Sequence, residues 1–433
     1  MISSASSGGK TGPQPLDGKI LKRYVASFHN RIDVFKDMYQ RCGSPQYLID
    51  THALATKAGE FRKAFQSRLP GFKAYYAMKS NNHPTVSQIL LNHSYGLDVS
   101  GRTELEQAIR LDARDILFSG PGKTEYEHEL ALEYADRVTV LLDSIGELQR
   151  LEQLAADSDI QIRAGVRLTT NENGLWRKFG ISPDRLKEFC KAARKCRFVN
   201  FRGIQFHTSW NMNAAKQIEF IERLGKILSG LEERDRRRLE FLDIGGGYWP
   251  ARGEWLHEFA ADSDSDKILN RFPSGHLCNP AESIEKFADK ISEALHQHIL
   301  PLADIEIFAE PGRWVCNGSM HILLKVIDKK DNDLVITDGG GNMIGWERFE
   351  TDYFPVINLT HPGLEEHPCY ILGSLCTPHD VWGYFYHGSK IEAGDLLLIP
   401  SQGAYTYSLR QEFIKPLPQA KRMREIENKK PKK

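Results

Sequence analysis

Between about residue 45 and residue 315 the chain alternates short apolar segments with amphipathic segments of helical period. This alternation is typical of parallel α/β folds, in which a helix follows each strand and covers the sheet. Helices are predicted, for example, over 103–111, 145–156 and 214–232. Eight strand–helix units in roughly 270 residues favour a closed (β/α)8 barrel over an open, doubly wound sheet. The predicted strands are 73–78, 96–99, 116–119, 138–142, 162–168, 201–207, 241–244 and 305–309.

After about residue 315 the sequence changes to short apolar segments separated by turns rich in Gly, Asn and Asp. We therefore predict a mainly antiparallel β domain over 316–420, to which we also assign residues 19–44. The barrel is expected to occupy 45–315. Within it, the stretch 251–282 has an Asp- and Ser-rich middle and is predicted to be a long loop before the last barrel strand.

Composition argues against several classes of protein. Lys plus Arg and Asp plus Glu both number 57, so no net field draws the chain to nucleic acid or to a membrane. The seven cysteines are irregularly spaced, which indicates reduced thiols and a cytoplasmic protein, and we expect no metal site. Residues 1–18 contain no apolar run and are predicted to be a disordered tail rather than a signal peptide. Residues 421–433 are predicted to be a basic flexible tail.

Polar residues fall on the ends of the predicted barrel strands. Lys79 follows the first strand, Asp98 lies near the end of the second, and His207 ends the sixth. The glycines 245–247 follow the seventh strand, and the segment 310–313 follows the eighth. In a (β/α)8 barrel the active site lies at the C-terminal ends of the strands. Several polar residues on one rim therefore predict a single site.

Each of these residues also has an ordinary interpretation. A lysine after a strand is usually a solvated strand end, and the functional alternative is a desolvated amine that forms a Schiff base. The three glycines form either a plain turn or a loop whose N–H groups hold a phosphate, with Arg313 adding a charge. His207 is either a core histidine or a flat ring against a flat cofactor. Glu310 is either a loop acid or the partner of a pyridine nitrogen.

Six motifs in one order resemble the signatures of the fold-type III pyridoxal-phosphate decarboxylases, a family that includes ornithine, diaminopimelate and arginine decarboxylases. The similarity runs in register from about Gln46 to Phe413. It implies a decarboxylase of an amino acid with pyridoxal 5'-phosphate as cofactor, built from a barrel and a β domain. The motifs are Tyr75–Asn81, Gly96–Ser100, Leu242–Gly247, Glu310–Arg313, Leu375–Asp380 and Gly403–Thr406.

The resemblance implies roles for individual residues. Lys79 is similar to the lysine that holds the cofactor, His207 to the catalytic residue stacked on the cofactor ring, and Glu310 to the partner of the ring nitrogen. The segment 178–180 resembles a recurring turn near the site. The other cofactor-binding residues that the resemblance implies are Asp98, Arg167, Ser209, Gly246, Gly247, Gly312, Arg313 and Tyr405.

In this family the site is completed across a homodimer interface. The resemblance implies that Cys376 is a catalytic proton donor and that Cys376, Thr377 and Asp380 bind substrate at the partner subunit's cofactor. Thr377 stands where relatives acting on free diamino acids carry an acid, which pairs with a distal ammonium group. Trp210 and Ile414 are further departures, where small residues and Asn are usual. We therefore expect a conjugated or modified diamino acid as substrate, as in siderophore or antibiotic biosynthesis.

Three alternatives stay open. The first is a decarboxylase of free ornithine, lysine or diaminopimelate. The second is a racemase that resembles alanine racemase, in which an arginine contacts the pyridine nitrogen, so that Glu310 favours decarboxylation. The third is a non-catalytic homologue that only binds partners, and the joint presence of Lys79, His207, Glu310 and Cys376 argues against it. Neither nucleic acid nor a membrane is an expected partner.

Overall fold

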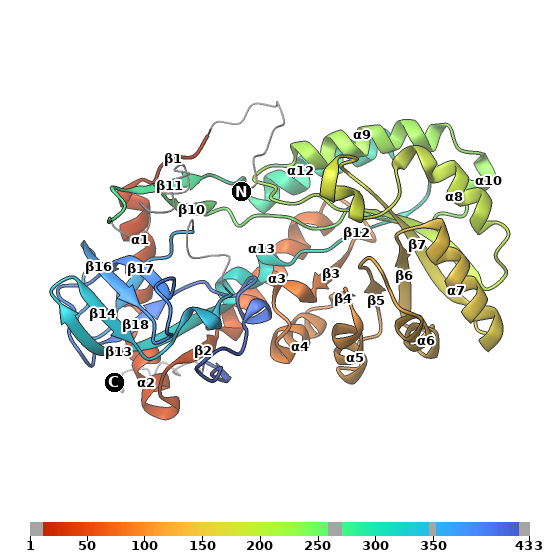
Figure 1. The fold of residues 1–433 in the computed structure, drawn as a ribbon. Helices are drawn as coiled ribbons and strands as arrows, with labels where there is room; N and C mark the ends of the chain where they lie inside the picture. The colour runs from red at the N-terminus through yellow and green to blue at the C-terminus, as the bar shows by residue number, and fades with distance from the viewer. Residues whose placement is uncertain (1–11, 259–270, 346–351, 424–433) are drawn as a thin grey trace, which may run out of the picture.

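The computed structural model describes residues 12–258, 271–345 and 352–423. Within these residues a closed barrel of eight parallel strands, in the order β12-β3-β4-β5-β6-β7-β8-β9, lies beside a β domain (Figure 1). The predicted (β/α)8 barrel is therefore confirmed. Its strands are β3 (Lys73–Ala77), β4 (Gly96–Val99), β5 (Ile116–Phe118), β6 (Val138–Leu142), β7 (Ile162–Leu168), β8 (Val199–Phe206), β9 (Phe241–Asp243) and β12 (Glu306–Ala309).

The barrel helices follow from amphipathic sequences with local capping signals. Helix α7 (Ile145–Ser158) begins after Ser144, whose side chain accepts a hydrogen bond from the N–H of Glu147. Its buried side is formed by residues such as Leu148 and Leu151, which pack into the barrel core. Among the described residues, no helix is long and apolar enough to cross a bilayer. The other helices around the barrel include α3 (Thr51–Gln66), α4 (Pro84–Asn92), α5 (Arg102–Arg110), α6 (Glu125–Glu133), α8 (Leu186–Ala193), α9 (Ala215–Ser229) and α12 (Ile284–His298).

A layer of large apolar side chains fills the inside of the barrel. Tyr75, Leu117, Leu141, Phe241 and Phe308 form one buried cluster, in which the rings of Phe241 and Phe308 stack with centroids 4.9 Å apart. Apolar packing of this kind makes the barrel interior a core rather than a channel. The polar residues at the ends of the strands therefore lie above a packed layer of apolar side chains.

The β domain is built on a mostly antiparallel sheet of order β14-β16-β17-β15-β18-β13-β2-β19. Helices α1 (Gly18–His29) and α2 (Ile32–Cys42) bury side chains in one cluster with residues of the sheet. The predicted mainly antiparallel architecture of this domain is confirmed. Its strands are β2 (Gln46–Ile49), β13 (Met320–Asp331), β14 (Leu334–Thr337), β15 (Val356–Asn358), β16 (Glu366–Leu372), β17 (Val381–His387), β18 (Leu396–Ile399) and β19 (Ala420–Arg422).

The structure corrects three predicted boundaries. Strand β2 pairs with β13 in the β domain, so the barrel does not begin at residue 45. Strand β19 pairs with β2, so the predicted basic tail begins inside the sheet, and 424–433 lie outside the described residues. Strand β1 (Gln14–Pro15) pairs with β11 (His276–Asn279), so the end of the predicted 1–18 tail is ordered by pairing, while residues 1–11 lie outside the described part.

The predicted 251–282 loop also contains regular structure. Strand β10 (Glu254–His257) pairs with β11 in an antiparallel ribbon, to which β1 adds a third strand. Residues 259–270, in the Asp- and Ser-rich middle, lie outside the described residues. These corrections share one cause: short strands that pair with distant segments carry little local pattern of their own.

Candidate active site

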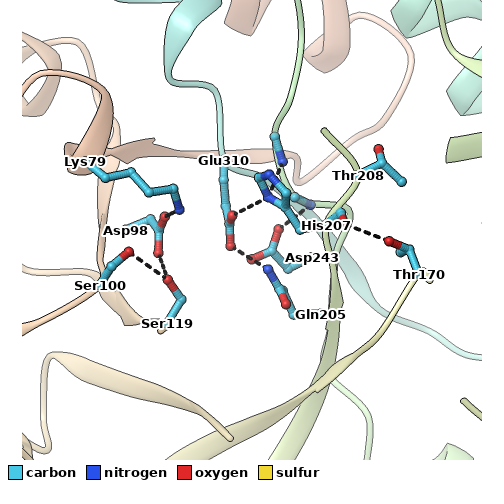
Figure 2. Close-up of polar contacts among 12 residues, drawn as sticks. Lys79, Asp98, Ser100, Ser119, Thr170, Gln205, His207, Thr208, Asp243 and Glu310 are labelled. Carbon is cyan, nitrogen blue, oxygen red and sulfur yellow. Dashed lines mark hydrogen bonds and ion pairs between the residues drawn. The ribbon is translucent and has the colours of Figure 1, made fainter. Parts of the chain in front are cut away.

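The twofold period of the barrel strands places the polar strand ends above the apolar layer. Asp243 is two residues beyond Phe241, and Glu310 is two residues beyond Phe308. Residues two apart on a strand point to the same face, so both carboxyl groups continue the inward direction of the two phenylalanines. Figure 2 shows Lys79, Asp98, Glu310, His207, Asp243 and Gln205 converging on one region.

Lys79 is held by a buried acid from the neighbouring strand. It lies in the short 3-10 turn η1 (Met78–Ser80) directly after β3. Its Nζ is 3.0 Å from Oδ2 of Asp98, and the hydroxyl of Ser119 donates to the other oxygen of Asp98 (Figure 2). Burial works against a charged amine, but Asp98 and then Glu310 outweigh it, so that the pKa of Lys79 is raised.

Glu310 lies at the centre of the site and is buried. Its Oε1 accepts a hydrogen bond from Nε2 of Gln205 at 3.0 Å, and its Oε2 is 3.2 Å from Nδ1 of His207. Burial opposes ionisation, but the contacts with His207 and Lys79 outweigh it and lower the pKa of this carboxyl. Glu310 is therefore suited to bind a protonated ring nitrogen.

The imidazole of His207 is fixed on one edge. The N–H of Gly246 donates to Nδ1 at 3.1 Å, and the same nitrogen faces Glu310. Burial lowers the pKa of His207, which favours the neutral ring. Two contacts at one nitrogen set the plane of the ring, as a stacking partner for a flat cofactor requires.

The glycines after β9 run against the neighbouring strand ends. Gly247 has φ +83°, and a Cβ there would lie 2.2 Å from the carbonyl oxygen of Thr208 and 3.1 Å from Cα of Ser209. A Cβ on Gly246 would lie 2.3 Å from the carbonyl oxygen of Glu310. Only glycine fits at these positions, and the loop leaves no side chain between its backbone and a ligand.

Arg313 supplies a cation beside this loop. It opens the short helix α13 (Arg313–Cys316), and its guanidinium lies 4.2 Å from the ring centre of Trp249 and 4.9 Å from that of Tyr405. Gly312 is packed so closely that a Cβ there would lie 3.0 Å from Cβ of Ser80. An arginine beside backbone N–H groups is suited to bind a phosphate.

The β domain reaches the site through the turn that contains Tyr405. The N–H of Tyr405 donates to the carbonyl of Ser80 at 2.7 Å, and Nδ2 of Asn81 donates to the carbonyl of Gly403 at 2.8 Å. These bonds fix the Tyr405 turn against the turn that carries Lys79. The two domains thus meet at the predicted cofactor lysine.

Arg167 lies at the end of β7 with its guanidinium 4.7 Å from the ring centre of Phe179. The N–H of Gly180 donates to a carboxylate oxygen of Asp143, which follows β6. This bond ties the turn at 178–180 to the rim of the barrel. The structure thus brings the turn beside Arg167.

The residues expected to act on a partner subunit lie in a turn of the β domain. Cys376 is exposed, and the hydroxyl of Thr377 accepts a hydrogen bond from the N–H of His379 at 3.4 Å. Asp380 is buried and accepts from the N–H groups of Gly341 and Leu375, both at 2.6 Å. Within one chain Asp380 therefore holds the shape of the turn that presents Cys376.

Sequence reasoning gave no role to Asp243, Gln205 or Ser119, which contact the predicted site residues. Gln205 donates to Glu310, Ser119 donates to Asp98, and Asp243 lies beside Glu310. Each is a polar residue at the end of an otherwise apolar strand. The alternation of side chains between the two faces of a strand would have identified all three as pointing into the barrel.

Comparisons with known proteins identify the family of both domains. Residues 56–317 match the pyridoxal binding domain of the pyridoxal-dependent decarboxylases, and residues 313–403 match their C-terminal sheet domain. Diaminopimelate decarboxylase of Campylobacter jejuni is 25% identical over 398 residues, 88% of this chain and 90% of that protein. L-glutamyl-[BtrI acyl-carrier protein] decarboxylase of Niallia circulans is 25% identical over 399 residues, 85% of this chain and 86% of that protein.

The fold also resembles that of a single-residue mutant of diaminopimelate decarboxylase from Helicobacter pylori, whose structure was solved in complex with L-lysine. The TM-score is 0.71 at 24% identity, over 87% of this chain and 90% of that one. Likeness at this level of identity concerns the arrangement of barrel and β domain.

Proposed function

The chain belongs to the pyridoxal-dependent decarboxylases, which decarboxylate amino acids, and we propose that its substrate is a conjugated or modified diamino acid of a biosynthetic pathway. The observation that carries the proposal is Thr377, a neutral residue in the exposed Cys376 turn. A threonine does not supply the negative charge that would pair with a free distal ammonium group.

The residues present fit the cofactor. The site offers the amine of Lys79 and the buried carboxylate of Glu310, with Gly246, Gly247 and Arg313 as candidates for the phosphate. When bound, pyridoxal phosphate supplies an electron sink for the pair of electrons released with the α-carboxylate. In our proposal Asp98, Arg167, Ser209, Gly312 and Tyr405 complete its surroundings.

The chain's own residues then have distinct tasks. Lys79 holds the cofactor and gives up its proton to Asp98 or to solvent before its Nζ can form a bond. His207 would pack against the cofactor ring, and Glu310 would keep the ring nitrogen protonated. Cys376 Sγ would deliver a proton to the α-carbon after the loss of carbon dioxide. A thiol can take this role because its S–H group is a proton donor.

We also propose that Cys376, Thr377 and Asp380 serve the site of a second copy, in a homodimer with shared sites. The resemblance supports this arrangement, and Cys376 is exposed on the single chain. Large apolar side chains are exposed as well, including Leu175 at 92% and Trp210 at 56% of their full surface. Exposed apolar side chains of this size are candidates for burial between subunits.

A decarboxylase of free diamino acids is the second candidate, and one observation favours it. Asp352 lines the same cavity as Arg313 and Glu254, close to the proposed phosphate site. A carboxylate there could pair with a distal ammonium group in place of the acid that Thr377 lacks. The relative from Campylobacter jejuni acts on diaminopimelate, whereas the one from Niallia circulans acts on a glutamyl group carried by a protein.

Competition kinetics separate the two candidates. The cofactor-loaded enzyme is given equal amounts of a free diamino acid (ornithine, lysine or diaminopimelate) and of its derivative acylated on the distal amine, and both amine products are quantified. The proposal predicts higher kcat/KM on the acylated compound. Higher kcat/KM on the free diamino acid would overturn it in favour of the second candidate.

A further inference from the structure

A second carboxyl group lies beside Glu310 inside the barrel (Figure 2). Asp243 is fully buried at the end of β9, and its Oδ1 accepts a hydrogen bond from the N–H of Gly245 at 2.8 Å. Its Oδ2 is buried and has no donor among the described residues. The carboxyl groups of Asp243 and Glu310 lie side by side (Figure 2). A hydrogen bond between them requires a proton on one of them, because two ionised carboxylates have none to donate.

Gln205 is a neighbour in the same cluster. It is the partner of Asp243 across strands β8 and β9, and its Nε2 donates to Oε1 of Glu310. Buried polar atoms are nearly always hydrogen-bonded, so the unmet Oδ2 of Asp243 fits a carboxyl oxygen that carries a proton of its own.

We propose that Asp243 is a neutral carboxylic acid that donates its proton to Glu310 and thereby keeps Glu310 ionised. The proposal deepens the proposed function and rests on it, because the ionised form of Glu310 is the one that binds the cofactor's ring nitrogen. Asp243 touches neither substrate nor reacting atoms in this scheme and is a positioning residue.

The surroundings of Asp243 favour the neutral form. Burial raises the pKa of Asp243, and the charges of Glu310 and Asp98 raise it further. The N–H of Gly245 acts in the opposite direction. Among the described residues, the other titratable side chains that interact with Asp243 are Tyr75 and Tyr248, whose pKa values are themselves raised by burial, so that both stay neutral and neither adds a charge.

The proposed proton gives Glu310 a second donor. Gln205 donates to Oε1, and Asp243 adds a proton from β9, whereas Nδ1 of His207 accepts from the N–H of Gly246. A carboxylate that accepts several hydrogen bonds is held in its charged form even when buried. The pairing of two acids, in which one is neutral, therefore accounts for an ionised group in the barrel core.

Infrared spectroscopy of the protein alone tests the protonation state. We expect the wild type at neutral pH to show a protonated carboxylic C=O band that is absent in Asp243→Asn. Asparagine can accept from Gly245 and donate to Glu310, so the fold should be kept. Gln205→Leu is the matched control, because it removes a neighbouring donor to Glu310 and should retain the band. An unchanged carboxylic band in folded Asp243→Asn would overturn the proposal.

Activity of the loaded enzyme tests the consequence for Glu310. Asp243→Leu removes the donor, so the pKa of Glu310 should rise and the acid limb of kcat/KM should move to higher pH. We expect kcat to fall about tenfold or more, the size expected for a hydrogen bond to a charged group. The Asp243→Asn variant should keep most of the wild-type kcat, and the acid limb of its kcat/KM profile should lie at the wild-type pH. Equal losses in both variants, with the same pH profile, would contradict the proposal.

The two experiments separate this proposal from the proposed function. The infrared result depends only on the protein and stands whether or not any amino acid is decarboxylated. If Asp243→Leu does not fold, the Asp243→Asn spectrum still decides. A wild-type carboxylic band that Asp243→Asn lacks, combined with no carbon dioxide from any amino acid, would refute the function and leave the proton on Asp243 in place.

Discussion

Lys79 Nζ lies 3.0 Å from Asp98 Oδ2, across the ends of neighbouring strands β3 and β4. The carboxylate is fully buried, so it acts on the amine with little screening by solvent. The ion pair with Asp98 keeps Lys79 charged and fixes its Nζ above the apolar layer inside the barrel. The amine of Lys79 is therefore held in position but protonated. The protonated form is unreactive, because only the neutral amine is a nucleophile.

Removing the acid should make Lys79 more reactive in the cofactor-free protein. In Asp98→Asn the pKa of Lys79 should fall, so a larger fraction of the amine is neutral at pH 8. We expect its acylation by a small amine reagent, quantified by mass spectrometry of the Lys79 peptide, to increase about tenfold or more. Equal acylation of wild type and variant would show that Asp98 does not control the amine. Lys73, which pairs with Glu306, serves as the internal control.

Replacing Lys79 should remove the covalent link to the cofactor. Lys79→Ala should lack the visible absorbance of bound pyridoxal phosphate and should show no turnover, because no other amine contacts Asp98 in this cluster. Borohydride reduction followed by peptide mapping checks the assignment in the wild type. A reduced cofactor adduct on a peptide without Lys79 would prove the assignment wrong.

Shared sites predict complementation between two inactive variants. Lys79→Ala subunits lack the cofactor lysine, and Cys376→Ala subunits lack the proton donor for the partner. In a mixed dimer one of the two sites would be intact, so mixing should restore part of the activity. Subunit exchange is verified independently with mass-tagged chains. Full exchange without any recovery would argue that each chain completes its own site.

Thr377 should control the choice between free and acylated substrates. Thr377→Asp introduces the missing charge and should shift preference toward a free diamino acid. A charge-assisted contact to a buried ammonium group is worth on the order of 2–5 kcal/mol. The ratio of kcat/KM for the free and acylated compounds measures the shift, with Thr377→Asn as the uncharged control. An unchanged ratio in the aspartate variant would assign the distal contact to another residue, such as Asp352.

The barrel could be predicted from sequence because its pattern is local. Each strand of the barrel is a short apolar run followed by an amphipathic helix, and the predicted 96–99, 138–142 and 162–168 agree with β4, β6 and β7. Strands β2 and β10 could not be placed in the same way. Strand β2 pairs with β13, which is remote in sequence, and β10 pairs with β11 beyond the Asp- and Ser-rich stretch, so their residues alone do not show the partner.

The site was predictable where a residue both ended a strand and matched a family motif. Lys79, Asp98 and Glu310 met both conditions, and His207, which ended a predicted strand, lies 3.2 Å from Glu310. The role of Asp243 depends on a contact between side chains from β9 and β12, which becomes visible only once the barrel closes. The proposed protonation of Asp243 follows from its burial, and the burial of this side chain cannot be read from the sequence.

Release of labelled carbon dioxide tests the central claim most directly. The cofactor-loaded enzyme is incubated with candidate amino acids, free and acylated, that carry an isotopic label in the α-carboxylate, and labelled carbon dioxide and amine are measured together. We predict equal molar amounts of the two products from the wild type and none from Lys79→Ala. Inversion at the α-carbon or exchange of its proton, without labelled carbon dioxide from any candidate, would contradict the account and indicate a racemase.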